Sequence, residues 1–569
     1  MLRRKVLTSI LWIFWLLVPL LGAAHERGYD EVFDGDGFVR PHYRQIYKAY
    51  KQLSKSQIRR IEKSTKKDFM GDNEMLALPR VISETEYAEL KAGVDQRGRA
   101  FLAFLRDHYS GKLSYLDKVI PADVMQRILE RNYEYDWVGT ANPEQLGFWY
   151  GPDIVRGRDG RWRVMEDNPC FVGGVGDLTL SKETALKYVP GYAKAQIVSR
   201  PERFYENLVK RYRGLAGGKE VVFLQYKRSV QPDHESRRIR AIFESLGVPN
   251  ASMRILKGED TGQYGPQLVV EKDGVYLLKS GAKGAEKVPV GFVITEVEPH
   301  QMDPRNPAAY RKRLLDEAQE MIAWRSVVPE RVREALKKES KPNPVTGQID
   351  FIALEKRIRG IKYNSLDRWY GVPGLFQAAA EGKVRLSSNP GLEFLGDKEF
   401  YMYVEDLIRF YLGEEPILRN VASRTFGKTV NGKRVLDEEL FKTVRENFQK
   451  YVIKPADGRG GEGIFVGPKD DPTKLAAILE KARANFDGTI LQEYMPLSEL
   501  EGYIVDQRLL ADVNMAAGVL VADSPWGRAS KGSKVNISVD GKVTAVFVVR
   551  PRAEDLQPGC AERLYRKRK

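Results

Sequence analysis

Hydrophobic and polar residues follow one another in short blocks that predict a mixture of strands and helices. The segment KEVVFLQY, residues 219–226, is an apolar run of strand length. It is followed by SRRIRAIFESLGV, residues 236–248, where apolar residues recur at helical spacing and Gly247 suits a helix end. A strand followed by a helix opens a strand-helix-strand unit, so we expect an α/β domain in the middle of the chain.

A further strand is expected at RWRVMEDN, residues 161–168, which ends in a carboxylate, an amide and then a proline. Side chains alternate along an extended chain, so Glu166 and Asn168 point to the same face. Such a pair of oxygen ligands suits Mg²⁺, which is usually shared with substrate phosphates. Taken alone, however, the stretch favours an ordinary strand end followed by an Asn-Pro turn.

A glycine-rich stretch lies between two more expected strands. In YVIKPADGRGGEGIFVG, residues 451–467, the pattern G-x-G-x-x-G joins two strands, whereas a dinucleotide fold needs a strand followed by a helix. The H-R-D and D-F-G motifs of a protein kinase and the P-loop motif are absent from the sequence. Two interpretations remain: a mobile hairpin without a ligand, or a hairpin whose backbone amides and Lys454 approach phosphates.

Composition excludes several classes of protein. The 569 residues are 42% hydrophobic and 30% charged, which is typical of a globular chain with roughly three or four structural units. The net charge of +15 is spread along the chain apart from the final RLYRKRK, and without a groove-reading or stacking motif we expect no nucleic-acid partner. Cys170 and Cys560 are too few for a disulfide scaffold or a cysteine-built metal site, although a single bridge stays open.

The N-terminus has the features of a signal peptide. MLRRK supplies positive charge, ILWIFWLLVPLL supplies an apolar run, and Gly22 and Ala24 form a small-x-small cleavage pattern. The run is short for a membrane span, so we expect export to the periplasm or medium with cleavage near Ala24. An uncleaved membrane anchor is the alternative.

Several separated motifs together resemble the circularly permuted ATP-grasp type 2 family. The metal-binding elements of an ordinary ATP-grasp protein come last in its sequence, whereas PDIVRGRDGRWRVMEDNP at 152–169 comes first here. The stretches GDKEF, VIKPADGRGGEGI, LQEYM and VDQRLL follow in the usual order near the C-terminus. YDEVFDGDGFVRPHY at 29–43, GVPGLF at 371–376 and YLGEEPIL at 411–418 also match, so the resemblance covers most of residues 29–550.

The resemblance implies an α/β (α+β) fold, namely a permuted ATP-grasp with a Rossmann-like middle domain, preceded by the signal peptide. We expect a signal peptide or anchor at 1–24 and the metal-binding half of the ATP-grasp at 25–215. The α/β pre-ATP-grasp-like domain would span 216–390, the nucleotide-binding region 391–550, and a basic tail 551–569.

The resemblance also assigns residues to ATP and Mg²⁺. Lys398 and Lys454 would contact phosphates, and Asp153, Glu166 and Asn168 would hold Mg²⁺. Arg508, Arg528 and Asn536 would act on the transferring phosphoryl group and the substrates, a task that suits the forked donors of arginine. The closing loop and the adenine and ribose contacts would come from Gly458, Gly460, Gly461, Gly463, Gln492, Glu493, Met495, Glu499 and Glu501.

The resulting hypothesis is an ATP-dependent carboxylate-amine ligase that works through an acyl-phosphate on small or peptide-like substrates. Two features depart from it: NISVDG at 536–541 lacks the paired glycines usual in the family, and an export signal is unexpected because ATP is scarce outside the cytoplasm. The alternative is an exported, non-catalytic protein that binds a nucleotide, a peptide or a cell-wall ligand. The sequence indicates neither the substrates nor the oligomeric state, and membrane contact is expected only through the N-terminal segment.

Overall fold

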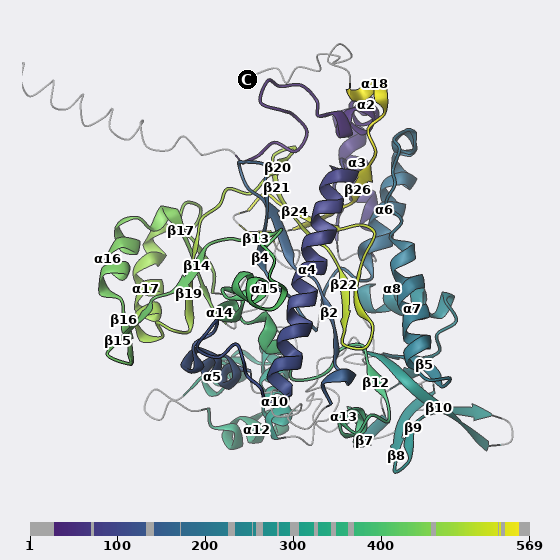
Figure 1. Cartoon of the computed structure of the whole chain (residues 1–569), viewed down its shortest axis with the longest axis vertical. Helices are drawn as coiled ribbons and strands as arrows, with labels where there is room; N and C mark the ends of the chain where they lie inside the picture. Colours follow the sequence, from purple (N-terminus) through teal and green to yellow (C-terminus); the bar gives the residue numbers. More distant parts are fainter. Residues whose placement is uncertain are drawn as a thin grey trace, which may run out of the picture.

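The computed structural model confirms a mixed α/β chain (Figure 1). It describes residues 28–69, 73–132, 142–225, 234–257, 266–295, 307–323, 328–342, 349–361, 369–456 and 463–556, apart from 171, 253, 282–283, 533 and 536–540. None of the helices within these ranges combines the length and apolar character that a membrane crossing requires. The predicted signal peptide and the part of the predicted basic tail from residue 557 onward lie outside the described residues, as does Cys560.

The central sheet joins segments that are far apart in sequence. Its strand order is β13-β4-β3-β21-β24-β25, with β20 paired to β21 beside this path. β3 and β4 form an antiparallel pair, β21 lies antiparallel to β3, and β13 lies parallel to β4. The strands are β3 (Asp153–Arg156), β4 (Trp162–Glu166), β13 (Arg419–Asn420), β20 (Glu499–Leu500), β21 (Tyr503–Arg508), β24 (Trp526–Ser530) and β25 (Lys542–Thr544).

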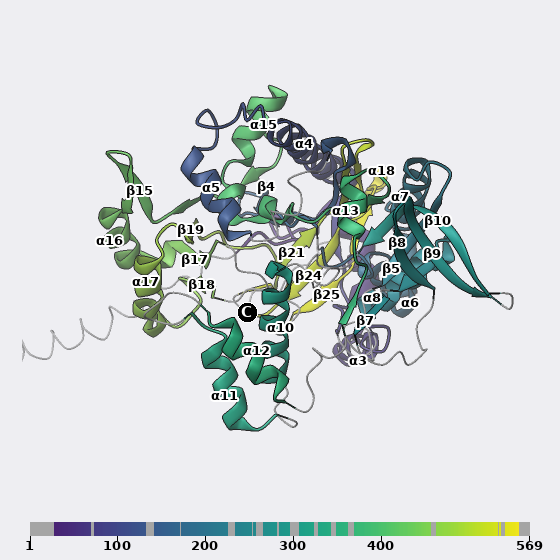
Figure 2. The same ribbon diagram turned by 90° about the horizontal axis from the view of Figure 1, so that it is seen from below.

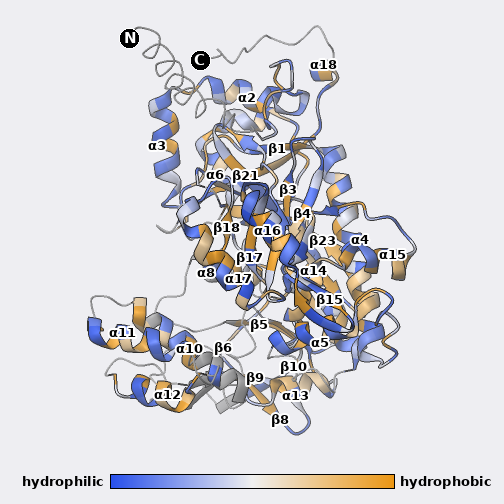
Figure 3. Cartoon of the chain, turned by 90° about the vertical axis from the view of Figure 1, so that its left-hand side faces the viewer, coloured by the Kyte–Doolittle hydropathy of each residue, from blue (hydrophilic) through white to orange (hydrophobic). Residues whose placement is uncertain are grey.

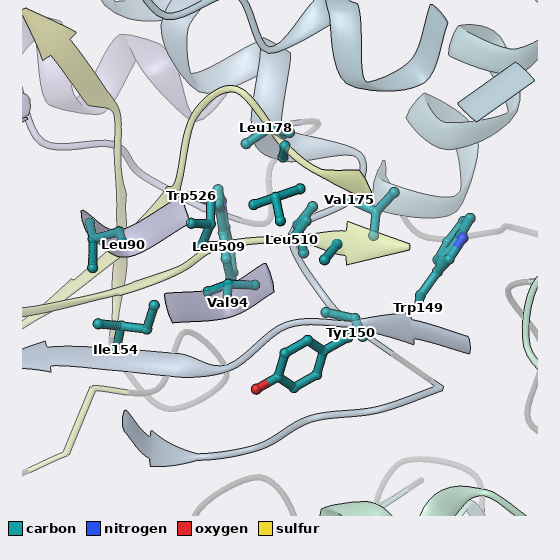
Figure 4. Packing of buried hydrophobic residues seen from close by; sticks show 14 of the residues in the cluster. Leu90, Val94, Trp149, Tyr150, Ile154, Val175, Leu178, Leu509, Leu510 and Trp526 are labelled. Atoms are coloured by element: carbon teal, nitrogen blue, oxygen red, sulfur yellow. The ribbon is translucent and has the colours of Figure 1, made fainter. Parts of the chain in front are cut away.

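Helix α4 (Glu84–Tyr109) is the long helix at the centre of Figure 1. It begins with a capping box in which Ser83 and Glu86 each accept a hydrogen bond from the other's backbone amide. The helix packs on the sheet β2 (Gly147–Tyr150), β22 (Ala511–Asn514) and β23 (Gly518–Val521), and also contacts β1 (Arg80–Ser83), the parallel partner of β26 (Val546–Val549). Figure 4 shows Leu90 and Val94 of this helix close to Leu509 and Trp526 in the main core.

The middle of the chain forms a six-stranded sheet of order β12-β10-β5-β6-β8-β9. The pairs from β12 to β8 are parallel and β9 is antiparallel to its neighbours. The expected strand-helix-strand unit is present as β5, helix α8 (His234–Ser245) and β6. The strands are β5 (Glu220–Gln225), β6 (Asn250–Ser252), β8 (Gln267–Glu271), β9 (Gly274–Gly281), β10 (Gly284–Thr295) and β12 (Arg385–Leu386), and β7 (Arg254–Lys257) pairs separately with β11 (Trp369–Gly371).

Helices cover this middle region and extend it. They are α7 (Glu202–Leu215), α8 (His234–Ser245) and α13 (Leu375–Ala380) near the sheet. Three more, α10 (Pro307–Ala323), α11 (Glu330–Glu339) and α12 (Phe351–Arg359), pack on one another around a small core of their own (Figure 2). Figure 3 shows both hydrophilic and hydrophobic residues on each of these three helices, as expected for helices with one buried face.

A separate lobe carries the glycine-rich stretch. Its sheet has the order β14-β19-β17-β18 and a core that includes Phe426, Phe441 and Leu491. Figure 1 shows the helices of this lobe lying at one side of the molecule. The elements are β14 (Ser423–Thr425), β17 (Tyr451–Pro455), β18 (Phe465–Val466), β19 (Thr489–Glu493), the hairpin β15 (Gly427–Val430) and β16 (Lys433–Leu436), and helices α16 (Glu438–Glu446) and α17 (Leu475–Ala484).

Shorter helices complete the fold. They are α2 (Arg44–Lys51), α3 (Lys55–Thr65), α5 (Ala122–Arg131), α6 (Asp177–Tyr188), α14 (Lys398–Tyr401), α15 (Val404–Leu412) and α18 (Ala553–Leu556). The motif at 29–43 leads into α2 and is held by a column of stacked side chains. Arg40 lies 4.1 Å from the Tyr29 ring, Arg156 lies 4.8 Å from that ring and 3.9 Å from Trp162, and Arg80 lies 4.9 Å from Trp162. Because guanidinium groups attract aromatic faces, this column ties the N-terminal segment to the β3-β4 hairpin.

Candidate functional site

The three central strands bring acidic and basic residues from both halves of the chain together. Asp153 at the start of β3 is in register with Glu166 at the end of β4 on one side and with Arg508 at the end of β21 on the other. The expected strand end at 161–168 is therefore present, and it lies beside residues more than three hundred positions later.

Two lysines from the later half of the chain reach the same place. Lys398 Nζ lies 3.4 Å from Glu166 Oε1. Lys454, on β17, donates to Gln492 Oε1 at 3.2 Å and is only 4% exposed. Burial lowers the pKa of Lys454 to about 8, with the charge of Glu166 opposing this shift and that of Lys398 adding to it. The backbone also joins the two elements, because Lys398 N donates to Ala456 O at 3.1 Å.

Asp153 is held by two arginines. Arg508 Nε donates to Asp153 Oδ1 at 2.8 Å, and Arg528 Nη2 donates to Asp153 Oδ2 at 2.7 Å. Arg528 also binds both carboxylate oxygens of Asp506, at 3.0 and 2.7 Å. Burial opposes ionisation of Asp153, but the positive charges of Arg508 and Arg528 outweigh it and lower the pKa of that carboxyl group. For Asp506 burial dominates and raises the pKa.

Asn168 and Glu166 fit a magnesium ion better than Asp153 does. Asn168 Nδ2 donates to Gly151 O at 3.2 Å, and the carbonyl oxygen of the same amide is the atom that can act as a metal ligand. The Glu166 side chain is 22% exposed, so it is accessible to an ion carried by a nucleotide. Asp153 already accepts from both arginines. Within the described ranges, no group of three or more His, Cys, Asp or Glu side chains could hold a metal ion.

The stretch expected to contact adenine lies at the end of β19. Gln492 is buried, and its Nε2 donates to Ser423 Oγ at 3.0 Å and to Met165 O at 3.3 Å, so it links this strand to β4 and β14. The amide of Glu493 donates to Ala422 O, and its side chain is exposed. Met495 lies beside the β3-β4 turn, where a Cβ at Gly157 would be 3.0 Å from its sulfur.

Not all of the other residues that the resemblance assigns to ATP or substrate lie beside Glu166, Lys398 and Lys454. Glu499 Oε1 accepts from Gly28 N at 3.4 Å, and the backbone of Glu499 pairs with that of residues 29–31, so it faces the N-terminal segment. Glu501 is exposed in the turn after β20, and its charge acts on Tyr50 of α2. Gly463 lies just before β18 with φ of +72°. Gly458, Gly460, Gly461 and Asn536 lie outside the described residues.

A buried network behind the site escaped the sequence argument. Arg97 of α4 donates to Asp167 Oδ1 at 3.1 Å and to Asp167 Oδ2 at 2.5 Å, and both side chains are almost fully buried. Tyr150 Oη donates to Asp167 Oδ1 at 2.5 Å, and Arg97 Nη1 donates to Asn420 Oδ1 at 2.9 Å. Asp167 lies between Glu166 and Asn168, so the network fixes the strand end that carries both of them.

A second pair of arginines supports Lys398. Arg131 of α5 donates to both carboxylate oxygens of Asp397 at 3.0 Å and to Glu399 Oε2 at 2.6 Å, and Arg127 donates to Glu399 Oε1 at 2.9 Å. Asp397 also caps α14 by accepting from Glu399 N at 2.8 Å. Acidic and basic residues alternate in GDKEF, a pattern that is typical of charge pairing, but no sequence pattern identified the partners on α5.

The chain matches the sequence profile of the family described as circularly permuted ATP-grasp type 2 over residues 79–225 and 361–517. It belongs to this family. The first matched segment contains Asp153, Glu166 and Asn168, and the second contains Lys398, Lys454 and Arg508. In the structure the two segments meet, because Lys398 lies beside Glu166 and Arg508 binds Asp153.

Named relatives of this ATP-grasp chain are distant. An uncharacterized protein of Mycobacterium tuberculosis is 26% identical over 553 residues, covering 93% of this chain and 85% of that protein. A Frankia casuarinae protein provisionally named as a glutamate–cysteine ligase is 24% identical over 84% of this chain, and the match covers 48% of the Frankia protein. A glutathione synthetase-like effector of Globodera pallida aligns with a TM-score of 0.48 and 10% identity, covering 87% of this chain and 98% of that one.

Proposed function

We propose that this protein is an ATP-dependent carboxylate-amine ligase that uses an acyl-phosphate intermediate. The observation that carries the proposal is the convergence of Glu166 with Lys398 and Lys454 around one place, since a carboxylate for Mg²⁺ and lysines for phosphates are what phosphoryl transfer from ATP requires. The name of the Frankia relative supports the same class of reaction.

In this mechanism the chain's own residues mainly bind the nucleotide and orient the reacting groups. Lys398 and Lys454 bind the phosphates, while Glu166 and Asn168 hold Mg²⁺, which when bound neutralises phosphate charge. Arg508 and Arg528 are positioned by Asp153 to offset negative charge on the transferring group. A substrate carboxylate attacks the γ-phosphorus and displaces ADP, which gives an acyl-phosphate. A neutral amine then attacks the acyl carbon, phosphate leaves with the electrons of the C–O bond, and the amine nitrogen releases a proton to the solvent.

The test is ATP-dependent hydroxamate formation, in which hydroxylamine captures an acyl-phosphate made from a panel of amino acids and short peptides. Lys454→Ala and Glu166→Ala should abolish the reaction and leave the melting temperature nearly unchanged. Arg445→Ala, on the exposed part of α16, is a control with one charge removed outside the site. Normal turnover in both site variants would contradict the assigned site.

A non-catalytic nucleotide- or ligand-binding protein is the second candidate. Both oxygens of Asp153 are engaged by arginines, and the apolar N-terminal run suggests export. Calorimetry distinguishes the two functions: Mg²⁺-dependent ATP binding without hydroxamate formation by any donor supports the second candidate. For localisation we propose export, and an intact Met1 in a cytoplasmic fraction would overturn it.

A further inference from the structure

Helices α2 and α3 carry a concentration of basic side chains on their exposed surface. The only carboxylate in residues 44–67 is that of Glu62, and Lys542 binds it at 3.0 Å. The exposed basic residues of this surface, which we call the α2–α3 face, are Lys48, Lys51, Lys55, Arg59, Arg60, Lys63, Lys66 and Lys67. Within the described part of the chain none of them forms an ion pair with a carboxylate, so the positive charge of the face is uncompensated.

The spacing of these cations works against the helix that carries them. Lys55, Arg59 and Lys63 follow one another at intervals of four residues, which places them in one row along α3. Like charges at this spacing destabilise a helix, and Lys55 in the first turn also opposes the helix dipole. In α4, by contrast, Asp95 and Arg99 at the same spacing pair at 2.9 Å. Helix stability therefore does not explain the row on α3, whereas an anionic partner would relieve its repulsion.

Further positive charge follows at the same end of the molecule. Asp555 of α18 accepts hydrogen bonds from Arg44 and Gln45 of α2, and Figure 1 shows α2, α3 and α18 near one another at one end. The sequence beyond α18 contains the basic run RLYRKRK, residues 563–569. This run is therefore attached to the protein beside the α2–α3 face.

The apolar N-terminal run leads to the same face. ILWIFWLLVPLL, residues 10–21, is followed closely by Tyr29, whose ring lies 4.1 Å from the guanidinium group of Arg40. Arg40 directly precedes the short helix Pro41–Tyr43, which continues into α2. When the apolar run enters a lipid bilayer, during export or as an anchor, the α2–α3 face is therefore brought close to the lipid headgroups.

We propose that the α2–α3 face binds the surface of an anionic phospholipid bilayer. Basic side chains that lie beside a membrane-directed segment are attracted to negative headgroups, and each of them adds to the affinity. A nucleic acid fits this face less well, because Tyr47 and Tyr50 of α2 are buried and offer no platform on which bases could stack. The proposal does not depend on the ligase activity.

Titration of the full chain with vesicles tests the proposal. One set of vesicles is phosphatidylcholine alone, and the other contains about 30% phosphatidylglycerol. The triple variant Lys55→Gln, Arg59→Gln and Lys63→Gln removes the row of charge but retains residues that favour a helix. Its partition coefficient for the anionic vesicles should fall by about 100-fold, since each cation near the surface contributes a factor of about five. Its melting temperature should not fall, because the repulsion within the row is removed.

A matched control removes the same number of charges from the lobe that carries the glycine-rich stretch. The variant is Lys442→Gln, Arg445→Gln and Lys450→Gln, all exposed on or just after α16, and its vesicle binding should stay within about twofold of wild type. Lysine acetylation followed by mass spectrometry gives a second readout that an inserted N-terminal run does not mask. Anionic vesicles should protect Lys55 and Lys63 from acetylation but leave Lys442 and Lys450 reactive.

Three results would overturn the proposal. Equal losses of vesicle binding in the two triple variants would show that net charge and not this face is responsible. Acetylation of Lys55 that anionic vesicles do not slow would show that the face does not contact lipid. A DNA duplex offered at the same phosphate concentration is the competing partner, and stronger protection of Lys55 by the duplex than by the vesicles would assign the face to nucleic acid instead.

Discussion

At the residue scale, Lys454 should make nucleotide binding depend on pH. Burial lowers its pKa to about 8, so the ammonium group is charged below pH 8 and loses its proton above it. We expect the ATP affinity to fall by up to about 10-fold between pH 7 and pH 9, because the charged fraction of a group with this pKa falls by about that factor. Calorimetric titration with ATP across this range measures it.

The matched control for this prediction is Lys454→Met, which retains the length of the side chain without its charge. Its ATP affinity should be low at pH 7 and nearly constant up to pH 9. A wild-type affinity that does not change between pH 7 and pH 9 would show that the Lys454 ammonium group is not a phosphate ligand.

The buried pair behind the site gives a second prediction. Asp167→Asn leaves the Arg97 guanidinium group buried without its anion, so the free energy of unfolding should fall by about 3–5 kcal/mol. Tyr150→Phe removes one hydroxyl group from the same carboxylate and should cost about 1–2 kcal/mol. Urea denaturation of the two variants checks both values, and equal losses would contradict the dominance of the ion pair.

The sequence could predict part of the candidate site but not the contacts that hold it. Period-two alternation placed Glu166 and Asn168 on one face, and the motif order indicated that Lys398 and Lys454 belong with them. Alternation could not show that Asp167, on the opposite face, binds Arg97 from seventy positions earlier. Nor could it show that Asp153 is engaged by Arg508 and Arg528, since such contacts depend on strand register and not on local pattern.

At the scale of elements, the turn after β4 requires glycine at 174. Its φ is +96°, and a Cβ would lie 2.4 Å from the Trp526 ring, so both backbone conformation and space exclude a side chain. Gly174→Ala should therefore shift the turn away from Glu235 and lower the melting temperature by several degrees, as expected for a strained substitution of about 1–3 kcal/mol. Gly214→Ala, on α7 with nothing within 4 Å, is the control and should not lower it.

The type of an element, helix or strand, was easier to predict than the elements that it contacts. Apolar runs and helical spacing indicated β5 and α8, and the two strands around the glycine-rich stretch are present as β17 and β18. The sequence did not predict that β13 and β4 are neighbours, because a parallel edge pair of two residues leaves almost no signal in either segment. The role of α5 was also missed, since its arginines act through Asp397 and Glu399 on another helix.

At the scale of the whole molecule, acid should unfold the protein through two histidines, the partly buried His42 and the buried His108. Burial lowers the pKa values of His42 and His108 to about 4, below the ordinary value of 6.5. The folded state therefore binds fewer protons than the unfolded state between these values, and stability that is complete above pH 6.5 is lost as the pH falls to 4. Each histidine contributes at most about 3 kcal/mol over this window.

Thermal unfolding between pH 7 and pH 4 measures this loss. The double variant His42→Gln with His108→Gln cannot take up these protons, so its melting temperature should change less over the window. His42 lies among Glu86, Arg156, Glu31 and Arg40, whose charges modify its shift, and His108 contacts Tyr115 Oη at 2.7 Å. A variant with the same pH dependence as the wild type would assign the acid sensitivity to carboxylates instead.

The partnership of β3 with β21 has a consequence for biosynthesis. Arg508 and Asp153 are 355 positions apart in the sequence. During translation the edge of β3 therefore has no β21 to pair with until almost the entire polypeptide has left the ribosome. Closure over so long a loop is slow, and an early hairpin edge attracts foreign strands. Nascent chains of this protein are accordingly expected to depend on chaperones, and truncation before residue 503 should yield aggregates in place of a smaller folded protein.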